Sequence, residues 1–585
     1  MTRSAGRGAR PGARPDRRRG ARELDAAGRA AIRGIARAGS ANLAAAGVGA
    51  VANLAIVVVV TRSVPATLAG SLFAATSVFL VALSLVEVGV DQGFVRFHAR
   101  NIALGRQWRN GPIRRSGFRL VLAVSGVAAL VGLVLAEPVA GLIADEETSR
   151  AAADMLRVLA LALPVAACYD LVLAVTRGRS RMRPTILVER IGRPVLQVGL
   201  LAVAAAAAAP ALWLAVAWTL PYLLGLLAGV AALRRSSDEP DAAAAGPVDG
   251  APALVEPPVP AADVPIPAVP EPPADGTAEP PTDDTAQPRT AQPPTDGAAG
   301  SDPGVAQFWR FTLPRGAARF FQVALQRADI AIVAALAGPA ASAVYTAATR
   351  FLVVGQLATQ ALQQVSEPQL ARLIAVDSRD AVRSVYHQLT LWSVALTWPL
   401  YLLVAVLAPV LLELIFGAGY AAGGASLTIL ALTMLVATAM GPVDVLLLMG
   451  GRSVLSLTNT GTALVVDVVG CLLLVPRLGV AGAAVSWAAA ILVRNLLGAV
   501  QVARHLRITP LATTALGMGA ACLALFGLLP WAADAAWGST NAVLVAAGVG
   551  AAGYAVILWR MSDALRLRTI LQRPRPADRR PGPRS

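Results

Sequence analysis

Long apolar runs recur along almost the whole of this 585-residue chain and restrict its fold more than any other feature. A helix needs roughly 20 apolar residues to cross the hydrocarbon core of a bilayer, which is about 30 Å thick. Fourteen stretches reach that length: 41–62, 68–90, 117–136, 156–175, 185–208, 211–233, 317–337, 342–365, 389–410, 425–448, 454–475, 479–503, 511–530 and 541–559. The sequence therefore predicts an all-α, polytopic membrane protein with about 14 transmembrane helices.

Composition excludes several other classes of protein. Charged residues make up 15% of the chain, whereas a soluble protein carries about 25%, so the apolar runs cannot be covered by a hydrated surface. All 51 basic residues are arginine, which excludes chemistry through a lysine Schiff base or a P-loop lysine. Cys168, Cys471 and Cys522 lie far apart inside apolar runs, so neither a metal site, a disulfide framework nor a cofactor is predicted.

The net charge of +16 is divided unevenly along the chain. Residues 1–40 hold 11 Arg and 3 acidic residues, 236–305 hold 1 Arg and 13 acidic residues, and 560–585 hold 8 Arg and 2 acidic residues. Between the apolar runs, arginines gather in alternate turns such as 91–116 and 176–184. Because arginine-rich loops stay in the cytoplasm, we expect a multi-pass protein of the cell membrane with both termini cytoplasmic. This distribution favours membrane loops over a nucleic-acid surface, and no nucleic-acid partner is expected.

The same composition shifts divide the chain into five segments. The stretch 236–305 contains 17 of the 40 prolines and many acidic residues, and it lacks the apolar surface needed to offset the entropy of ordering. We therefore predict a disordered cytoplasmic linker between a six-helix bundle at 41–235 and an eight-helix region at 306–559. The eight-helix region is expected to be a second six-helix bundle plus two extra helices. Residues 1–40 and 560–585 are predicted to be basic cytoplasmic tails, the first of them disordered.

Polar residues inside the apolar runs are the best candidates for function, because polar groups at membrane depth generally face a cavity or a partner. One stripe occupies about 80° of a helix face at 100° per residue, and Arg327 falls outside it. Its members are Arg315, Arg319, Gln322, Gln326 and Asp329. A second stripe follows on the next predicted helix: Thr349, Gln356, Gln360, Gln363 and Glu367. Together the stripes predict a water-filled cleft, with interhelical hydrogen bonding as the alternative.

A third group lies on the span 185–208, where Arg190, Arg193 and Gln197 share a face and Glu189 can pair with Arg193 at i,i+4. Snorkelling of these arginines to the membrane surface is the competing interpretation. Further isolated charges inside spans are Asp170, Asp444, Asp467 and Arg494. Because the planar guanidinium fork suits phosphate oxygens, an arginine-lined cavity predicts an anionic, phosphate-bearing substrate.

Several stretches resemble one known family. The segment 61–97, TRSVPATLAGSLFAATSVFLVALSLVEVGVDQGFVRF, resembles the start of bacterial polysaccharide or O-antigen flippases. These belong to the multidrug/oligosaccharidyl-lipid/polysaccharide exporter superfamily. The residues that match the family pattern are Arg62, Gly70, Gly89, Arg96 and Phe97. Val64-Pro65 departs from the usual Leu-Gly, and the acidic linker replaces a short cytoplasmic loop.

The second half is also similar to that family. LPRGAARFFQVALQRADIAIVAALAG at 313–338 is similar to the span that opens the family's C-terminal half, with Asp329 as its acidic residue. IFGAGYAAGGASLTIL, from Ile415, resembles its Phe-Gly-x-x-Tyr turn, and VPRLGVAGAAVSWAAA at 475–490 resembles its Pro-x-x-Gly segment. The resemblance covers most of residues 41–510. It implies two helical bundles around a central cleft, and a lipid-linked oligosaccharide moved by alternating access.

The expected function is therefore that of a flippase rather than an enzyme. It would move an undecaprenyl-diphosphate-linked oligosaccharide across the cytoplasmic membrane for cell-surface polysaccharide biosynthesis. Arg319 is expected to hold the diphosphate, and the other candidate substrate-binding residues are Gln322, Gln326, Asp329, Gln356, Gln360 and Arg193. Expected partners are the lipid-linked oligosaccharide, membrane lipids, a polysaccharide polymerase and glycosyltransferases. The alternatives are a lipid II flippase, a drug/cation antiporter using Asp329 or Asp467, or a membrane glycosyltransferase or polymerase.

Overall fold

The computed structural model describes residues 47–179, 181–235, 303–375, 378–509 and 512–562. Helices account for 92% of the described residues, which contain no strand, and the all-α prediction is confirmed. The predicted tails at 1–40 and 560–585 and the predicted linker at 236–305 lie almost entirely outside the described residues. The exceptions are the last three linker residues, which begin a helix at Pro303, and Arg560 to Ser562.

Each of the fourteen predicted spans falls mainly on helix over its described residues, which leave out 41–46 and 511. In the first half the helices are Gly47–Ser63, α2 Ala66–Val86, α3 Val90–Ala103, α4 Asn110–Ile143, α5 Glu146–Gly178, the π-helical turn Thr185–Gly192, α6 Arg193–Ala206 and α7 Ala211–Arg235. In the second half they are α8 Pro303–Ala337, α9 Pro339–Ala375, α10 Arg379–Val406, α11 Ala408–Phe416, α12 Gly424–Ala439, α13 Val443–Met449, α14 Ser453–Leu478, α15 Val480–Leu506, α16 Thr513–Cys522, α17 Leu529–Trp537 and α18 Thr540–Arg560.

Eleven helices of the described chain are long and apolar enough to cross a membrane. Large apolar side chains also cover the outer surface, with Val134 77% exposed on α4 and Trp559 74% exposed on α18. Exposure of an apolar surface of this extent is unfavourable in water but not in the hydrocarbon of a bilayer. The protein is therefore a polytopic membrane protein.

Three predicted spans are broken rather than continuous: 389–410 divides at Leu407, between α10 and α11, and two others divide at glycines. The span 425–448 divides at Gly441 and Pro442, where Gly441 has a φ of +71° and proline supplies no amide hydrogen, so α12 ends and the short helix α13 begins. The span 68–90 divides after Glu87, where both Val88 and Gly89 have positive φ, and α3 continues at an altered angle. Both glycine breaks lie beside the cavities described below.

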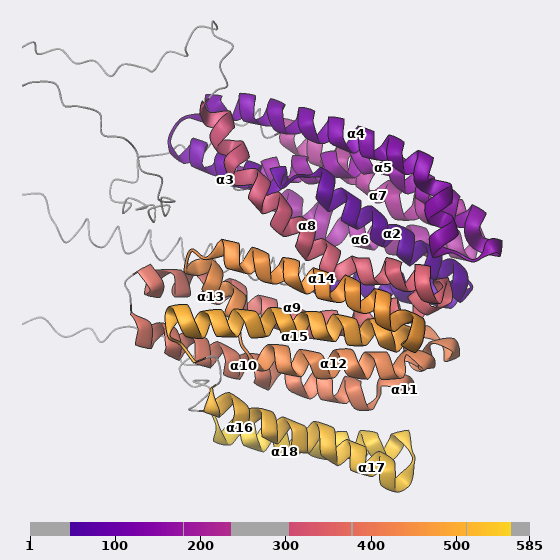
Figure 1. The fold of residues 1–585 in the computed structure, drawn as a ribbon, viewed down its shortest axis with the longest axis vertical. Coiled ribbons are helices and arrows are strands. Elements are labelled where there is room, and N and C mark those ends of the chain that lie inside the picture. The colour runs from indigo at the N-terminus through magenta and orange to yellow at the C-terminus, as the bar shows by residue number, and fades with distance from the viewer. Residues whose placement is uncertain (1–46, 180, 236–302, 376–377, 510–511, 563–585) are drawn as a thin grey trace, which may run out of the picture.

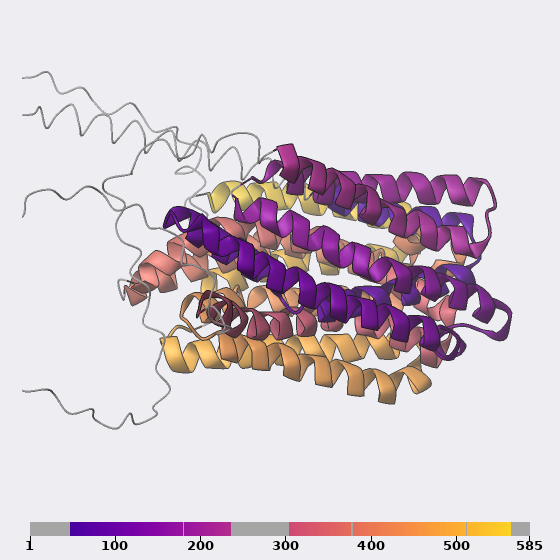
Figure 2. The same cartoon turned by 90° about the horizontal axis from the view of Figure 1, so that it is seen from above.

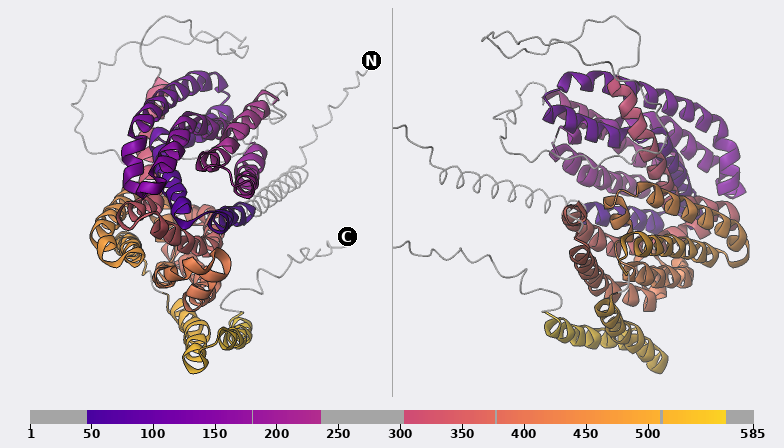
Figure 3. Two further views of the ribbon diagram at one scale, coloured as in Figure 1. Left: turned by 90° about the vertical axis from the view of Figure 1, so that its right-hand side faces the viewer. Right: turned by 60° about the vertical axis from the view of Figure 1, so that its left-hand side comes forward.

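The helices run roughly parallel or antiparallel to one another (Figure 1), and the view from above shows the same alignment (Figure 2). Viewed along the helices, the first half forms one group, the second half forms another beside it, and α16, α17 and α18 lie at the far edge (Figure 3). These last helices pack on one another and on α10, and α16 also contacts α12.

Helix α8 links the two groups. It begins beside α3 and α4 of the first half, passes α2, and reaches α14 and α9 of the second half, so it crosses the bundle diagonally (Figure 1). We call the end of the bundle where α8 starts the Pro303 end. The opposite end, where Gly338 joins α8 to α9, is called the Gly338 end. Helix α2 starts at the Gly338 end, since Gly70 there packs against Pro339.

Candidate functional site

A cavity of about 410 Å³ lies between the two halves. Its walls come from the helix Gly47–Ser63, α2, α5, the turn before α6, α6, α7, α8 and α9, so both halves contribute. The charged residues that line it are Asp170, Glu189, Arg193, Arg319, Arg327 and Arg350. Four arginines against two acids make its lining positive, and we call it the arginine cavity.

Three of these arginines carry charge that no carboxylate neutralises directly. The Arg193 guanidinium donates to the Tyr222 hydroxyl at 2.9 Å and lies 5.0 Å from the centre of that ring. Nε of Arg350 donates to the carbonyl oxygen of Thr346 at 3.3 Å. Within the described residues, Arg193, Arg327 and Arg350 have no carboxylate within ion-pair distance. Their donors are therefore available to an anion in the cavity.

Arg319 is held differently. Its guanidinium lies 3.1 Å from Oε2 of Glu87 and 3.0 Å from Oδ2 of Asp91, and the Glu87 side chain is fully buried. The break between α2 and α3 places both carboxylates toward α8. Arg319 still lines the cavity, but its charge is already matched. The sequence prediction that Arg319 holds the diphosphate therefore has less geometric support than the same role for its three neighbours.

The predicted pairing of Glu189 with Arg193 is wrong. Glu189 instead forms an ion pair with Arg177 on α5, at 2.9 Å. The reason is local backbone geometry, because Thr185–Gly192 is π-helical and has more residues per turn than an α-helix. Residues four apart no longer lie one above the other there. Arg193 consequently turns toward Tyr222 and the cavity rather than toward the membrane surface.

A second cavity of about 300 Å³ lies within the second half, between α8, α9, α13, α14 and α15. Seven of its nineteen lining residues are amides: Gln322, Gln326, Gln356, Gln360, Gln363, Asn459 and Asn495. We call it the amide cavity. Gln326 lines both cavities, so the two spaces adjoin along α8.

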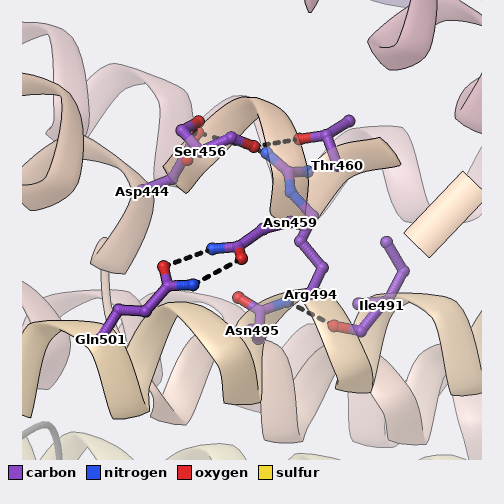
Figure 4. Close-up of polar contacts among 8 residues, drawn as sticks. All are labelled: Asp444, Ser456, Asn459, Thr460, Ile491, Arg494, Asn495 and Gln501. Carbon is purple, nitrogen blue, oxygen red and sulfur yellow. Dashed lines mark hydrogen bonds and ion pairs between the residues drawn. The ribbon is translucent and has the colours of Figure 1, made fainter. Parts of the chain in front are cut away.

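Fixed polar pairs form one side of the amide cavity (Figure 4). The Arg494 guanidinium lies 3.2 Å from Oδ2 of Asp444, and Oδ1 of the same carboxylate accepts a hydrogen bond from the Ser456 hydroxyl. Asn459 and Gln501 exchange two amide hydrogen bonds, each 2.8 Å long. The break at Gly441 and Pro442 brings Asp444 into this wall.

The structure brings most of the sequence-predicted site residues to these two cavities. Arg193 and Arg319 line the arginine cavity, Gln322, Gln356 and Gln360 line the amide cavity, and Gln326 lines both.

Asp329 lies apart from both cavity linings. It is buried between α8 and α9, where it accepts a hydrogen bond from the Tyr345 hydroxyl at 2.7 Å. Asp467 on α14 is likewise buried, and the Cys471 thiol lies 3.9 Å from its Oδ1, measured from the sulfur.

Sequence reasoning missed Arg327 and Arg350 as lining residues. The polar stripe on α8 was treated as one face, but α8 contacts two cavities. At 100° per residue Arg327 lies about 80° from Arg319, on the side that faces α2 and α7, whereas Gln322 lies about 60° to the other side. A helix that lies between two cavities needs polar residues over a wider arc of its surface than one stripe. The position of Arg327 outside the stripe was therefore the signal in the sequence for a second cavity.

Glu87 and Asp91 were missed for another reason. They lie at the end of a predicted span, where acidic residues are ordinarily assigned to a solvated loop. Only the break at Val88 and Gly89 turns both carboxylates inward to Arg319.

The five residues of the sequence pattern at 61–97 all lie at contacts between that segment and the second half. At the Gly338 end, Arg62 donates to the carbonyl oxygens of Ile415 (3.0 Å), Glu413 (3.4 Å) and Leu414 at the end of α11.

Gly70 packs on the backbone of the second half at the same end. A Cβ on Gly70 would lie 1.6 Å from the carbonyl oxygen of Pro339, so only glycine allows this approach of α2 to α9. The Gly338 end is thus closed by contacts to backbone atoms.

The Pro303 end is closed by α8. Gly89 and Gly316 pack backbone to backbone, and a Cβ on Gly89 would lie 2.5 Å from the nitrogen of Gly316. The Arg96 guanidinium lies 4.3 Å from the centre of the Phe311 ring, while Phe97 packs edge to face on Phe308 at 5.5 Å between ring centres. With the ion pairs of Arg319 to Glu87 and Asp91, these contacts join the two halves at both ends of their interface.

Comparison with known proteins gives matches over both halves. A family described as polysaccharide biosynthesis protein matches residues 302–422, and the MatE family matches residues 48–203. No curated protein matches the chain by sequence.

Solved structures share the fold. An inward-facing multidrug resistance MATE family transporter of the MOP superfamily is similar with a TM-score of 0.59 and 14% identity, over 80% of this chain and 99% of that one. The lipid II flippase MurJ, in an inward closed conformation, is similar with a TM-score of 0.63 and 9% identity, over 91% and 99%. A MOP superfamily transporter from Pyrococcus furiosus is similar with a TM-score of 0.52 and 14% identity, over 81% and 95%.

These similarities agree with the arrangement of two helical halves around a cavity. The two family matches, one in each half, agree with the resemblance recognised in the sequence. Each half of the chain thus matches one of these two family models, and the fold is the one shared by solved transporters of the multidrug/oligosaccharidyl-lipid/polysaccharide exporter (MOP) superfamily.

Proposed function

We propose that the protein is a flippase for an undecaprenyl-diphosphate-linked oligosaccharide, which it moves between membrane leaflets by alternating access for cell-surface polysaccharide biosynthesis. The observation that carries this proposal is the arginine cavity, in which Arg193, Arg327 and Arg350 present guanidinium groups that no carboxylate among the described residues neutralises. Guanidinium forks bind phosphate oxygens in two-point contacts. The match of residues 302–422 to polysaccharide biosynthesis proteins supports a saccharide on the lipid.

The proposed direction is from the Pro303 end, which the arginine-rich turns assign to the cytoplasm, to the Gly338 end. In this cycle the diphosphate enters when the Pro303 end opens, and Arg193, Arg327 and Arg350 replace its hydration. Closure of that end and opening of the Gly338 end then releases it to the outer leaflet. In the described structure the two halves are in contact at both ends, and each step of this cycle would break the contacts at one end.

The proposal is tested in cells that depend on this protein for surface polysaccharide. Lipid-linked glycan is labelled by an externally added lectin after the protein is depleted and replaced by variants. The double variant Arg327→Gln/Arg350→Gln should reduce externally accessible glycan at least tenfold, because each lost charge-assisted hydrogen bond costs about 1.5–3 kcal/mol. Arg310→Gln, an exposed arginine of α8 outside both cavities, is the control. Wild-type labelling with the double variant would contradict the proposal.

The buried pair Asp329 and Asp467 supports one alternative, a cation-driven drug antiporter. Both carboxylates are at most 2% exposed, and Oδ2 of Asp467 has no hydrogen-bond partner among the described residues. Efflux of cationic drugs, abolished by Asp467→Asn, would favour this function. Transport of lipid II by the purified protein in vesicles would favour a lipid II flippase. Extension of a lipid-linked sugar would favour a membrane glycosyltransferase or polymerase.

A further inference from the structure

The two adjoining cavities differ in charge. The arginine cavity has four guanidinium groups and two carboxylates in its lining, whereas the amide cavity contains one guanidinium and one carboxylate, Arg494 and Asp444, which pair with each other. The amide cavity is therefore polar but electrically balanced. An anion has no unmatched cation to bind there, and a cation has no unmatched carboxylate.

Four glutamine side chains of the amide cavity have no hydrogen-bond partner among the described residues. The side chains of Gln322, Gln356, Gln360 and Gln363 form no hydrogen bond with any described residue, although each amide offers two donors and an acceptor. Because unpaired polar groups at membrane depth are costly, this cluster fits a ligand that supplies both donors and acceptors. Hydroxyl groups do so, and a sugar ring carries several on adjacent carbons.

We propose that the amide cavity is the binding site for uncharged sugar units of the transported lipid, separate from the site of its diphosphate. This inference rests on the proposed function, since it places the two parts of one substrate in two cavities. The glutamines of α8 and α9 would bind the hydroxyl groups. Trp487, which also lines the cavity, supplies an apolar ring face for the C–H face of a sugar.

The dimensions and position of the cavity agree with this division. Its volume of about 300 Å³ lies at the lower end of the range for small-molecule sites, which suits one or two sugar rings rather than a long chain. It adjoins the arginine cavity through Gln326, as a sugar directly linked to a diphosphate requires. The wall formed by α13, α14 and α15 is held in place by the Arg494–Asp444 ion pair and by the Asn459–Gln501 amide pair (Figure 4), so little ordering is needed on binding.

The test compares two probes on the full chain in nanodiscs. One is undecaprenyl diphosphate without sugar, and the other is the glycolipid that accumulates in cells depleted of the protein. The variant Gln356→Ala/Gln360→Ala should raise Kd for the glycolipid about tenfold and leave Kd for undecaprenyl diphosphate within twofold. Arg327→Gln/Arg350→Gln should raise both Kd values by similar factors. Gln307→Ala, an exposed glutamine of α8 outside both cavities, should change neither.

Each outcome decides the inference. Loss of affinity for both probes in the glutamine variant, or for neither, would overturn it. Thermal unfolding serves as the check that the variant is folded, and if the double variant cannot be purified, Gln360→Ala alone is used because that residue is exposed. A different result would contradict the proposed function itself: binding of neither probe by the wild-type chain.

Discussion

The two ends of the interface between the halves are closed by different chemistry. At the Gly338 end, the contacts of Arg62 and Gly70 are to backbone atoms of the second half. At the Pro303 end, a glycine pair is accompanied by aromatic packing and by the buried ion pairs of Arg319. All of these Pro303-end contacts come from one helix, α8.

The difference indicates how each end can open. Backbone contacts at glycine depend on a fixed helix position, so the Gly338 end separates when α2 and α9 move apart as rigid bodies. Side-chain ion pairs can exchange partners, so an anionic substrate near Arg319 could compete with Glu87 and Asp91 while the end opens. The Pro303 end is therefore the end at which substrate charge can influence conformation.

The largest effect is expected from Gly70→Val. Its Cβ would lie 1.6 Å from the Pro339 carbonyl oxygen, so α2 and α9 cannot approach and the Gly338 end stays open. Transport should be abolished. Spin labels at the exposed positions Leu142 and Leu478 near this end should move apart in pulsed electron resonance. Gly126→Ala on α4, where a Cβ meets nothing within 4 Å, is the control, and unchanged distances in Gly70→Val would refute rigid closure at this end.

Gly316→Val should produce the opposite state. Its Cβ would lie 2.4 Å from the carbonyl carbon of Val88, which separates α8 from the α2–α3 junction and holds the Pro303 end open. Labels at the exposed positions Leu104 and Val454 should then move apart, and those at the other end should not. If both variants lengthen the same label pair, the two ends do not open independently.

Arg319→Gln should destabilise the protein by about 3–5 kcal/mol, because it leaves the buried Glu87 and Asp91 carboxylates without a cation. Thermal unfolding in detergent measures the change. Addition of Glu87→Gln should recover part of it by removing one unpaired charge. Arg315→Gln, an exposed neighbour with a Phe311 ring contact at 5.5 Å, should cost less than 1 kcal/mol by the usual range for such contacts, and equal losses in the two variants would contradict this account.

Arg62→Gln should have the smallest effect. Arg62 is exposed, and its hydrogen bonds to three carbonyl oxygens can be replaced by water, so a loss of about 1 kcal/mol and a several-fold slower transport rate are expected. Transport is measured by glycan accessibility, as above. A loss as complete as that of Gly70→Val would show that the arginine, rather than the glycine contact, closes the Gly338 end.

The positions of the helices could be predicted because membrane thickness sets a minimum length for a transmembrane helix, and the apolar runs reach that length. The breaks inside 68–90 and 425–448 were not predicted, since hydropathy averages over the two or three residues that change direction. Gly441-Pro442 carried a local signal in its residue types, whereas Val88 in a positive-φ conformation carried none.

Site residues could be predicted from the sequence only where they repeat at helical spacing along a single helix. The glutamines of α8 and α9 repeat at helical spacing, and the structure places them together. Partners that come from separate helices, such as Glu87 with Arg319 or Asp444 with Arg494, have no periodic relation in sequence. Their proximity follows from tertiary packing, which a single sequence does not encode in any local pattern.

The diagonal course of α8 has a consequence for biosynthesis. Because α8 begins against α3 and α4, which are synthesised before it, its first turns have a docking surface as soon as they leave the ribosome. The first half thereby acts as a template that positions the start of the second. A chain divided within 236–302 should still assemble when both fragments are made in one cell, since α8 of the later fragment carries its own attachment site.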